Sequence, residues 1–219
     1  MKDASPTTIY LKDYTPFPFR VKNVHLTFQL DPLKTRVISL VEFEPISSAV
    51  QNELFLHGED LRLIWAKIDG TAVSPQITKG GLSVQVPSAG FIWECEVEIA
   101  PQNNTSLEGL YMSNGMYCTQ CEAEGFRKIT YYPDRPDVMA QFHVRIEGDL
   151  PILLSNGNPK AQGENWAEWQ DPWPKPAYLF ALVAGRLIAH RDTFTTESGN
   201  HVALNIWVRP GDEHKCGFG

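Results

Sequence analysis

The sequence lacks both a long hydrophobic run and an excess of positive charge. Its longest clearly apolar stretch, Ala177 to Ala184, is eight residues long, whereas a helix that spans a bilayer needs about 20. The chain has 19 Lys and Arg against 26 Asp and Glu, a formal net charge of −7. Nucleic acids and anionic membrane surfaces recruit clustered basic side chains, so we expect neither as a partner.

Cysteine is scarce, with four residues at positions 95, 118, 121 and 216. Four are too few for a disulfide scaffold in a chain of 219 residues, which can bury a sizeable core without covalent staples. No apolar stretch follows Met1-Lys2-Asp3-Ala4-Ser5-Pro6, so we expect no secretory signal. A reducing cytosol is the simplest setting, which predicts a cytoplasmic protein. A mature secreted protein stays open as the alternative.

The motifs of common catalytic centres are also missing. A catalytic zinc takes about three protein ligands, often from an HExxH helix, but none of the six histidines is followed by Glu and no two lie four apart. The sequence has no GxSxG or SxxK for a serine nucleophile, and no GxGxxG or P-loop for a nucleotide. We therefore expect no catalytic residue, no metal ligand and no cofactor in this chain.

What the sequence contains is hydrophobic alternation with a period of two, which predicts strands. Residues 24–30 and 37–43 alternate on either side of the turn 31–34, which predicts a hairpin. Phe91 to Ile99 alternate with three glutamates, which predicts a strand with one buried and one acidic face. Further strands are expected at residues 61–68, 82–86, 141–146, 152–154, 166–170, 178–184 and 202–208.

Helical periodicity is nearly absent. One short helix is expected at Arg135–Ala140, with Asp134 as its cap and with ion pairs among Asp134, Arg135 and Asp137. The Pro-rich segment Gln170–Pro176 predicts a rigid surface connection, because proline is excluded from central strands. Residues 1–219 contain no repeat and no Gly/Ser linker, which predicts one domain. The fold expected is all-β, a saddle-like multi-sheet β-sandwich with at most one short helix.

Three groups of residues are candidates for function. The CxxC at Cys118–Cys121 lacks the second pair of a zinc site and the strand-to-helix setting of a redox motif, so two semi-buried thiols are preferred. Glu122 and Glu124 would share one face of an extended segment, where two carboxylates hold an amine or act as acid and base. A solvated surface is the commoner outcome. The aromatic residues at 166, 169, 173, 178 and 180 predict a core cluster before a sugar-stacking platform.

Long motifs along nearly the whole chain resemble one known family in their order and spacing. They are Leu107–Tyr111, Cys118–Thr130, Tyr132–Val138, Leu154–Asn158, Trp169–Pro172, Lys175–Pro176, Tyr178–Gly185 and Arg191–Thr196, with shorter matches at Leu11–Tyr14 and His57–Leu61. These motifs resemble the amino-terminal domain of aminopeptidase N of the bacterial and plant type. The tail after Gly211 departs from the family's usual continuation.

The resemblance implies a zinc exopeptidase that removes amino-terminal residues from peptides. It implies a saddle of β-sheets that packs on a thermolysin-like catalytic domain, which carries the zinc ligands, the general-base Glu, the GAMEN loop and a transition-state Tyr. None of those motifs occurs here, so zinc would belong to the longer polypeptide, the parent enzyme, and this chain alone should be inactive. The expected partners are the missing catalytic domain and a peptide with a free amino terminus.

The family's Gln-x-Glu motif matches Gln120 and Glu122. The resemblance implies that the Glu122 carboxylate helps to bind the α-amino group of the substrate, with Gln120 as a polar contact in the same pocket. A carboxylate facing a buried ammonium makes charge-assisted hydrogen bonds, whereas an internal amide would leave it unpaired at a high free-energy cost. Glu124 has no counterpart in the motif.

Two other classes of function stay open. A stand-alone β module that binds peptides or proteins without chemistry would be favoured by a natural stop after residue 219. A carbohydrate-binding sandwich would use Trp166 and Trp169. If the chain is an excised domain, we expect an exposed apolar patch near the Gln120–Glu122 segment, where the catalytic domain was removed.

Overall fold

The structure of the protein is a computed structural model, which describes residue 8 and residues 10–47 and 52–217. The expectation of no secretory signal rests on residues 1–6, which lie outside the described residues. None of the helices in the described part of the chain is long and apolar enough to cross a membrane.

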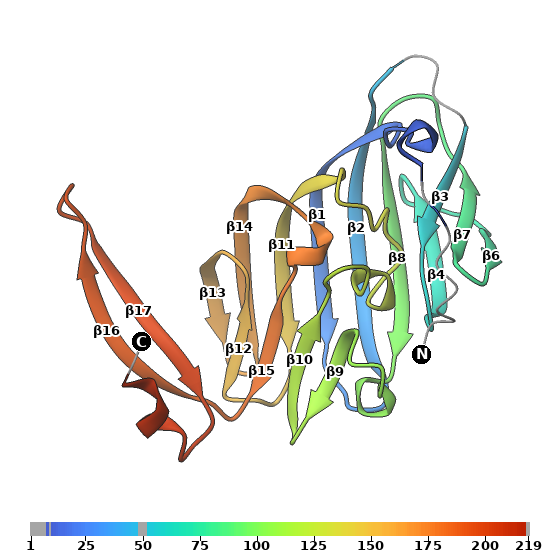
Figure 1. Ribbon diagram of the computed structural model, residues 1–219. Coiled ribbons are helices and arrows are strands. Elements are labelled where there is room, and N and C mark those ends of the chain that lie inside the picture. Colours follow the sequence, from blue (N-terminus) through green and yellow to red (C-terminus); the bar gives the residue numbers. More distant parts are fainter. Residues whose placement is uncertain (1–7, 9, 48–51, 218–219) are drawn as a thin grey trace.

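An eight-stranded sheet forms the body of the molecule (Figure 1). The strand order is β13-β14-β11-β1-β2-β8-β4-β5. The bounds are β1 Phe19–Gln29, β2 Thr35–Pro45, β4 Arg62–Ile68, β5 Thr71–Ala72, β8 Phe91–Ile99, β11 Met139–Glu147, β13 Asn158–Gly163 and β14 Trp166–Pro176. Neighbouring strands in this sheet pair antiparallel, except β1 and β11, which are parallel.

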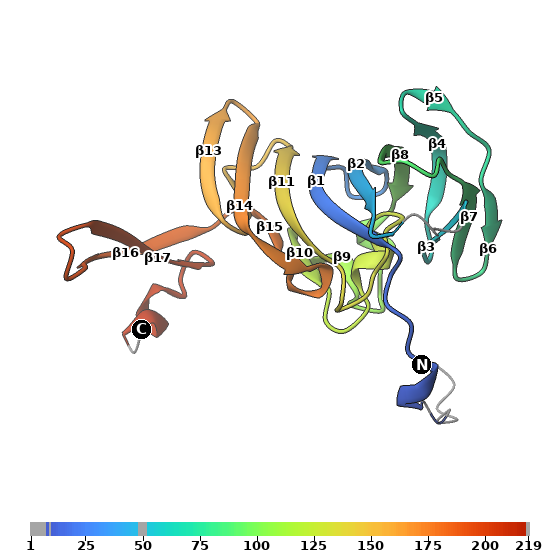
Figure 2. The ribbon, with the colours of Figure 1, turned by 90° about the horizontal axis from the view of Figure 1, so that it is seen from above.

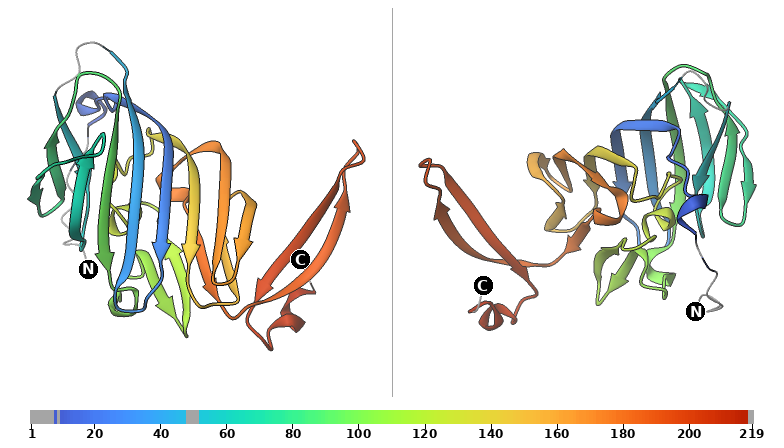
Figure 3. Two further views of the ribbon diagram at one scale, coloured as in Figure 1. Left: turned by 180° about the vertical axis from the view of Figure 1, so that it is seen from behind. Right: turned by 45° about the horizontal axis from the view of Figure 1, so that its top comes forward.

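Three smaller sheets accompany the body sheet. The first has the order β12-β15-β10-β9, the second β3-β7-β6, and the third is the hairpin β16-β17. Their bounds are β3 Glu53–His57, β6 Gln76–Thr78, β7 Gly81–Gln85, β9 Gly109–Ser113, β10 Met116–Gln120, β12 Ile152–Ser155, β15 Leu182–Gly185, β16 Ile188–Thr195 and β17 His201–Val208. From above, the four-stranded sheet lies against one face of the body sheet and the hairpin stands apart (Figure 2). The same separation is visible from behind and from an oblique angle (Figure 3).

The helical part of the described chain consists of short 3-10 turns. These are η1 Leu11–Asp13, η2 Pro101–Asn103, η3 Phe126–Lys128, η4 Ala177–Leu179 and η5 Glu213–Cys216. The all-β, multi-sheet fold class is therefore confirmed. The predicted hairpin is β1-β2, and its turn is held by Asp31, whose carboxylate accepts the backbone N–H groups of Leu33 and Lys34 at 2.8 and 2.9 Å.

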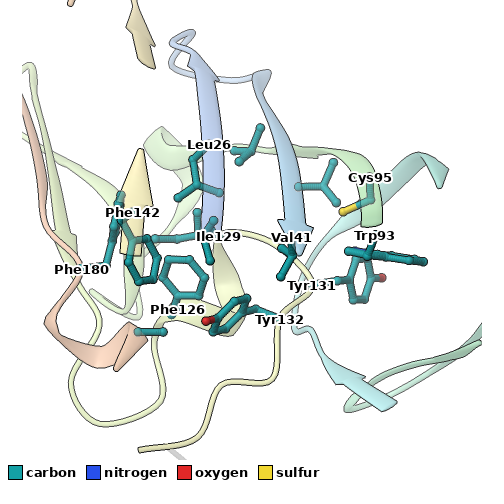
Figure 4. Close-up of a cluster of buried hydrophobic side chains, with 14 of the residues drawn as sticks. Leu26, Val41, Trp93, Cys95, Phe126, Ile129, Tyr131, Tyr132, Phe142 and Phe180 are labelled. Carbon is teal, nitrogen blue, oxygen red and sulfur yellow. The ribbon is translucent and has the colours of Figure 1, made fainter. Parts of the chain in front are cut away.

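The core lies where the body sheet meets the segment that connects β10 to β11. Burial alternates along β1, β2, β8 and β11, so each strand turns one row of side chains inward. The Phe126 ring of η3 is fully buried and lies 5.1 Å from the Tyr132 ring and 5.4 Å from the Phe180 ring (Figure 4). Phe142 of β11 completes this aromatic group at 6.0 Å from Phe126. The connecting segment is thereby fixed to the sheet by apolar burial.

A small polar cluster lies within this core. The hydroxyl of Thr130 donates to the Ser39 hydroxyl at 3.1 Å, and the Cys95 sulfur lies 3.3 Å from Ser39 Oγ and 3.6 Å from Thr130 Oγ1. All three side chains are fully buried. Because buried hydroxyls are costly unless they are paired, this cluster selects one position for the connecting segment on β2 and β8.

The predicted helix at Arg135–Ala140 is wrong. Residues 136–137 form a turn, and Met139 and Ala140 already belong to β11. The Arg135 guanidinium clamps this turn, because it donates to both carboxylate oxygens of Asp137 at 2.7 and 2.8 Å and to the Thr15 carbonyl at 2.7 Å. These side-chain bonds favour the turn over a helix that would be only six residues long.

The expectation that Gln170–Pro176 forms a surface connection is also wrong, because β14 runs through it. β13 pairs with β14 only as far as Gln170, so Pro172 and Pro174 lie beyond the last residue pair of that ladder. Opposite them, the register jumps at a bulge between Ala140 and Phe142. Lys175 spans the bulge, with Nζ 3.0 Å from Asp171 Oδ2 and 4.0 Å from the Phe142 ring centroid.

The strand expected at 178–184 is only partly confirmed. The chain forms η4 first and enters β15 at Leu182. Asn156 holds the intervening bend, since its amide donates to the Leu179 carbonyl at 3.1 Å and its oxygen accepts from the Ala181 N–H at 2.6 Å. A side chain from the bend between β12 and β13 thus overrides the local apolar run.

Replacement of Phe126 by Ala tests whether η3 is anchored as described. We expect the free energy of unfolding to fall by about 3–5 kcal/mol in urea denaturation, because a large buried ring leaves a cavity. Phe194, which is 58% exposed on the hairpin, is the matched control, and its replacement by Ala should change stability by less than about 0.5 kcal/mol. Equal losses in the two variants would contradict the packing described.

Candidate functional site

The two predicted substrate-binding residues lie at the end of β10 and in the turn that follows it. Gln120 is the last residue of β10 and pairs with Gly109 of β9. Residues 122–125 then form a turn that leads into η3. The Gln120 side-chain amide donates to the Glu122 carbonyl at 3.2 Å, so the two residues are in direct contact. Both side chains are exposed, and no hydrogen bond ties the Glu122 carboxylate to the described part of the chain.

The turn closes tightly because two glycines allow backbone segments to approach each other. The Gly125 N–H donates to the Cys121 carbonyl at 2.8 Å. A Cβ atom at Gly125 would lie 2.3 Å from the Gln120 carbonyl oxygen, which is a severe clash. Gly109 has a φ of 74°, and a Cβ atom at this position would clash with Lys128 and the Gly125 carbonyl oxygen. The position of Glu122 relative to β9 and β10 therefore depends on both glycines.

A buried ion pair between Arg127 and Asp134 supports the turn. Arg127 Nε lies 3.1 Å from Asp134 Oδ2, the Arg127 backbone N–H donates to the same oxygen at 3.1 Å, and Arg127 Nη2 donates to the Asp134 carbonyl at 3.1 Å. The side chains are 11% and 2% exposed. Burial raises the pKa of Asp134, and the hydrogen bonds and charge of Arg127 oppose that rise. The sequence did not predict this pair, because it assigned Asp134 to a helix cap and to Arg135.

The idea that Glu122 and Glu124 share one face of an extended segment is wrong, because the segment is a turn. Glu124 Oε1 lies 3.5 Å from Arg127 Nη2, on the side of the buried ion pair. Glu59 Oε1 lies 3.9 Å from Arg127 Nη1. Lys128 is held by Glu108 at 3.0 Å and by Asp60 at 3.9 Å. Glu122 therefore differs from its acidic neighbours in facing solvent without an ion-pair partner in the described residues.

A backbone bridge attaches the site to the sheet β3-β7-β6. His57 and Tyr132 exchange both backbone hydrogen bonds, at 2.9 and 3.1 Å, and the Glu59 N–H donates to the Arg127 carbonyl at 3.0 Å. Burial and the positive charge of Arg127 lower the pKa of His57, which favours the neutral imidazole. The segment 57–61 thus fixes, through backbone hydrogen bonds, the residues that follow the turn.

The CxxC beside the turn consists of free thiols. Cys121 is buried and Cys118 half-buried, and no disulfide joins them. Burial raises the pKa of both thiols, which disfavours the reactive thiolate. The preferred interpretation, a pair of semi-buried thiols, agrees with this burial and with the two cysteines being free.

The residues present do not fit a zinc site. In the parts of the chain that the structure describes, no three His, Cys, Asp or Glu side chains come together as ligands for a metal ion. A catalytic zinc takes about three protein ligands. If the parent enzyme uses zinc, the ligands must come from outside the described residues.

The predicted aromatic cluster is split in the structure. Phe180 is part of the core, while Trp173 is 76% exposed on the bulge of β14. Trp166 and Trp169 line a separate hollow together with Trp207 of β17. The Trp169 indole N–H donates to the Leu153 carbonyl at 3.0 Å, so its ring orientation is fixed. The five aromatic residues therefore form no single stacking platform.

Exposed apolar side chains gather on the β16-β17 hairpin. Phe194, Val202, Leu204 and Ile206 are between 38% and 58% exposed. Almost every residue of the two strands is exposed, and the pair has no further strand on either side in the described chain. An isolated two-stranded hairpin is marginally stable in water. Such a hairpin is expected to pack against something larger.

Comparison with known proteins assigns the family. Residues 21–179 match the family model of the peptidase M1 N-terminal domain. The chain belongs to the peptidase M1 family. The M1 match includes the Gln120–Glu122 turn and its Arg127–Asp134 support, and it ends before the β16-β17 hairpin. The resemblance found in the sequence is thereby confirmed, and the chain contains the N-terminal domain of an M1 aminopeptidase of the aminopeptidase N type.

The most informative relatives are aminopeptidases. Aminopeptidase N of Caulobacter vibrioides is 46% identical over 229 residues, covering 100% of this chain and 26% of the relative. Aminopeptidase N of Escherichia coli is 46% identical over 216 residues, covering 94% of this chain and 25% of the relative. Legionella pneumophila aminopeptidase A, solved in complex with aspartic acid, superposes with a TM-score of 0.86 at 31% identity, over 95% of this chain and 26% of that one. The M1 chain described here spans about a quarter of the length of these relatives.

Replacement of Arg127 by Met tests the buried support of the turn. The unpaired Asp134 carboxylate should lower the free energy of unfolding by about 3–5 kcal/mol in urea denaturation at neutral pH. Arg135→Met is the matched control, because the Arg135–Asp137 pair is partly exposed, at 29% and 23%, and should cost only about 1 kcal/mol. A loss at Arg127 no larger than that at Arg135 would exclude a supporting role.

Proposed function

We propose that this chain is the substrate-recognition and scaffold domain of a zinc-dependent aminopeptidase that removes amino-terminal residues from peptides. The family match and the two aminopeptidase N relatives support the proposal. The observation that carries it is the Gln120–Glu122 turn, an exposed carboxylate on a rigidly supported backbone. The proposal includes a cytoplasmic location and a parent enzyme that is longer than this chain.

Glu122 is assigned to the free α-amino group of the peptide. Its carboxylate has no cationic partner among the described residues, whereas Glu124 and Glu59 lie beside Arg127. When the rest of the parent enzyme covers the turn, a substrate ammonium would neutralise this carboxylate through charge-assisted hydrogen bonds. A peptide bond inside a chain offers no positive charge there and would leave the carboxylate buried and unpaired. The outcome is selection for amino termini.

Gln120 is assigned to orienting the turn and to a polar contact in the same pocket. Its amide nitrogen donates to the Glu122 carbonyl, which leaves its side-chain oxygen free to accept a hydrogen bond from the substrate amine. An acceptor and a carboxylate on one turn match the three donors of an ammonium group better than a carboxylate alone.

The chain supplies recognition but no reactive centre. Zinc and the groups that act on the peptide bond are assigned to the part of the parent enzyme outside this chain, because the described residues do not fit a metal site. The domain alone is therefore inactive. Its binding partner is that catalytic domain, and the exposed apolar hairpin β16-β17 is the surface assigned to the junction. The apolar patch that the sequence predicts near Gln120 and Glu122 stays a prediction.

Replacement of Glu122 by Gln in the full-length parent enzyme tests the proposed function. The neutral amide keeps the shape but loses a charge-assisted hydrogen bond of about 1.5–3 kcal/mol, so kcat/KM for an aminoacyl p-nitroanilide should fall about 10- to 100-fold. Glu124→Gln is the control on the same turn and should change kcat/KM by less than about threefold.

The same assay on the isolated 219-residue chain should give no turnover, with or without added zinc. Unchanged kcat/KM in Glu122→Gln, or an equal loss in both variants, would rule out Glu122 as the amine anchor. Turnover by the isolated chain would rule out the proposal that this chain supplies recognition and the catalytic domain supplies the chemistry.

A further inference from the structure

The body sheet has one internal seam. Strands β1, β2, β4, β5 and β8 come from residues 19–99, and β11, β13 and β14 come from residues 139–176. In the strand order, the two sets meet only at the parallel pair β1 and β11. The chain crosses from one set to the other once, through residues 100–138, which include the Gln120–Glu122 turn. The integrity of the sheet therefore depends on the β1–β11 contact.

Two histidines lie opposite each other on this seam. His25 of β1 is in register with His143 of β11. Their rings are stacked, with centroids 4.4 Å apart and an interplanar angle of 9°. His25 is exposed and His143 half-buried, while the flanking residues Val24 and Leu26 point into the core. The pair is on the solvent side of the sheet, where protons have access.

The charges around the pair do not neutralise it. Lys160 of β13 lines the same hollow, as do Arg145 of β11 and Glu168 of β14. Arg145 and Glu168 are already paired with each other, at 2.7 Å. On the other side, Glu42 of β2 accepts a hydrogen bond from Asn23 at 2.9 Å and is the carboxylate whose charge favours protonated His143.

We propose that the His25–His143 stack is an acid-sensitive latch on the β1–β11 seam. When both imidazoles are neutral, they stack and cover the strands beneath them. When both are protonated, two positive charges lie 4.4 Å apart next to Lys160, and their repulsion opposes the pairing of β1 with β11. Acid thus weakens the sheet at the contact that joins its two halves.

The direction of the pH effect follows from proton linkage. Burial, the charge of His25 and the charge of Lys160 lower the pKa of His143, and Glu42 only partly opposes them. The unfolded chain therefore binds more protons than the folded chain once the pH falls below the ordinary histidine pKa of about 6.5. Stability is complete above that pH and is lost as the pH falls from there through the lowered folded pKa.

A double-mutant cycle on the 219-residue chain isolates this effect from other acid titrations. Urea unfolding is measured at pH 7.5 and 5.5 for the original protein, His25→Gln, His143→Gln and the double variant. The coupling between the two substitutions, taken from all four proteins, should change by about fivefold in the unfolding equilibrium constant between pH 7.5 and 5.5, the size of a repulsion between two unit charges at this distance in water. His201→Gln on the exposed hairpin is the control and should keep the original pH response.

A second readout does not depend on unfolding. NMR titration of the imidazole protons should show the pKa of His143 rising in His25→Gln, because the neighbouring charge is gone. Backbone amides of β1 and β11 should exchange with solvent faster at pH 5.5 than those of β2 and β8, after correction for intrinsic rates. The same coupling at both pH values, or an unchanged His143 titration, would overturn the latch.

Discussion

The Arg127–Asp134 ion pair is the contact on which the geometry of the Gln120–Glu122 turn depends. Asp134 is 2% exposed, so its carboxylate needs the two hydrogen bonds that it accepts from Arg127 Nε and the Arg127 backbone N–H, and Arg127 Nη2 adds one to the Asp134 carbonyl. The pair closes the segment between η3 and β11 into a compact unit. The turn with Glu122 precedes it in the chain, and Phe126, which lies between them in the sequence, packs in the aromatic group with Tyr132 and Phe142. A charged contact and an apolar contact thus both fix the backbone of the segment 126–134.

This arrangement explains how the backbone that carries an exposed carboxylate is fixed on a β scaffold. Strands β9 and β10 deliver Gln120, and the glycines at 109 and 125 let the chain fold back within contact of its own backbone. The backbone bridge between His57 and Tyr132 joins this segment to the sheet β3-β7-β6. The backbone of so braced a turn loses little conformational freedom when Glu122 binds a ligand, which favours a fixed position for the binding group. The hairpin β16-β17 stands outside this unit and presents apolar surface.

The sequence predicts the strands well and the contacts between distant residues poorly. Alternation along 24–30, 37–43 and 91–99 is a local signal of one buried face, and β1, β2 and β8 follow it. The proline rule failed at 170–176 because β13 pairs with β14 only as far as Gln170. The helix at 135–140 failed because Arg135 binds Asp137 and Thr15 instead. Both failures come from partners that local sequence does not reveal.

The candidate site shows the same limit. Gln120 and Glu122 were found through a family motif, since two polar residues at this spacing are common on surfaces. Spacing alone placed Glu122 and Glu124 on one face, whereas the turn sends Glu124 to Arg127. The Arg127–Asp134 pair has no periodic signature, because it joins two ends of an irregular loop. The position of that loop follows from the buried Phe126 and Thr130, which only the packed sheet defines.

The most direct test of the central claim is a crystal structure of the full-length parent enzyme with a bound amino acid product. The account predicts that the α-amino nitrogen lies within about 2.7–3.2 Å of a Glu122 carboxylate oxygen, with Gln120 at its side. A bound amino acid whose ammonium is held by other groups, with Glu122 in solvent, would contradict the account and leave this domain with a scaffold role only.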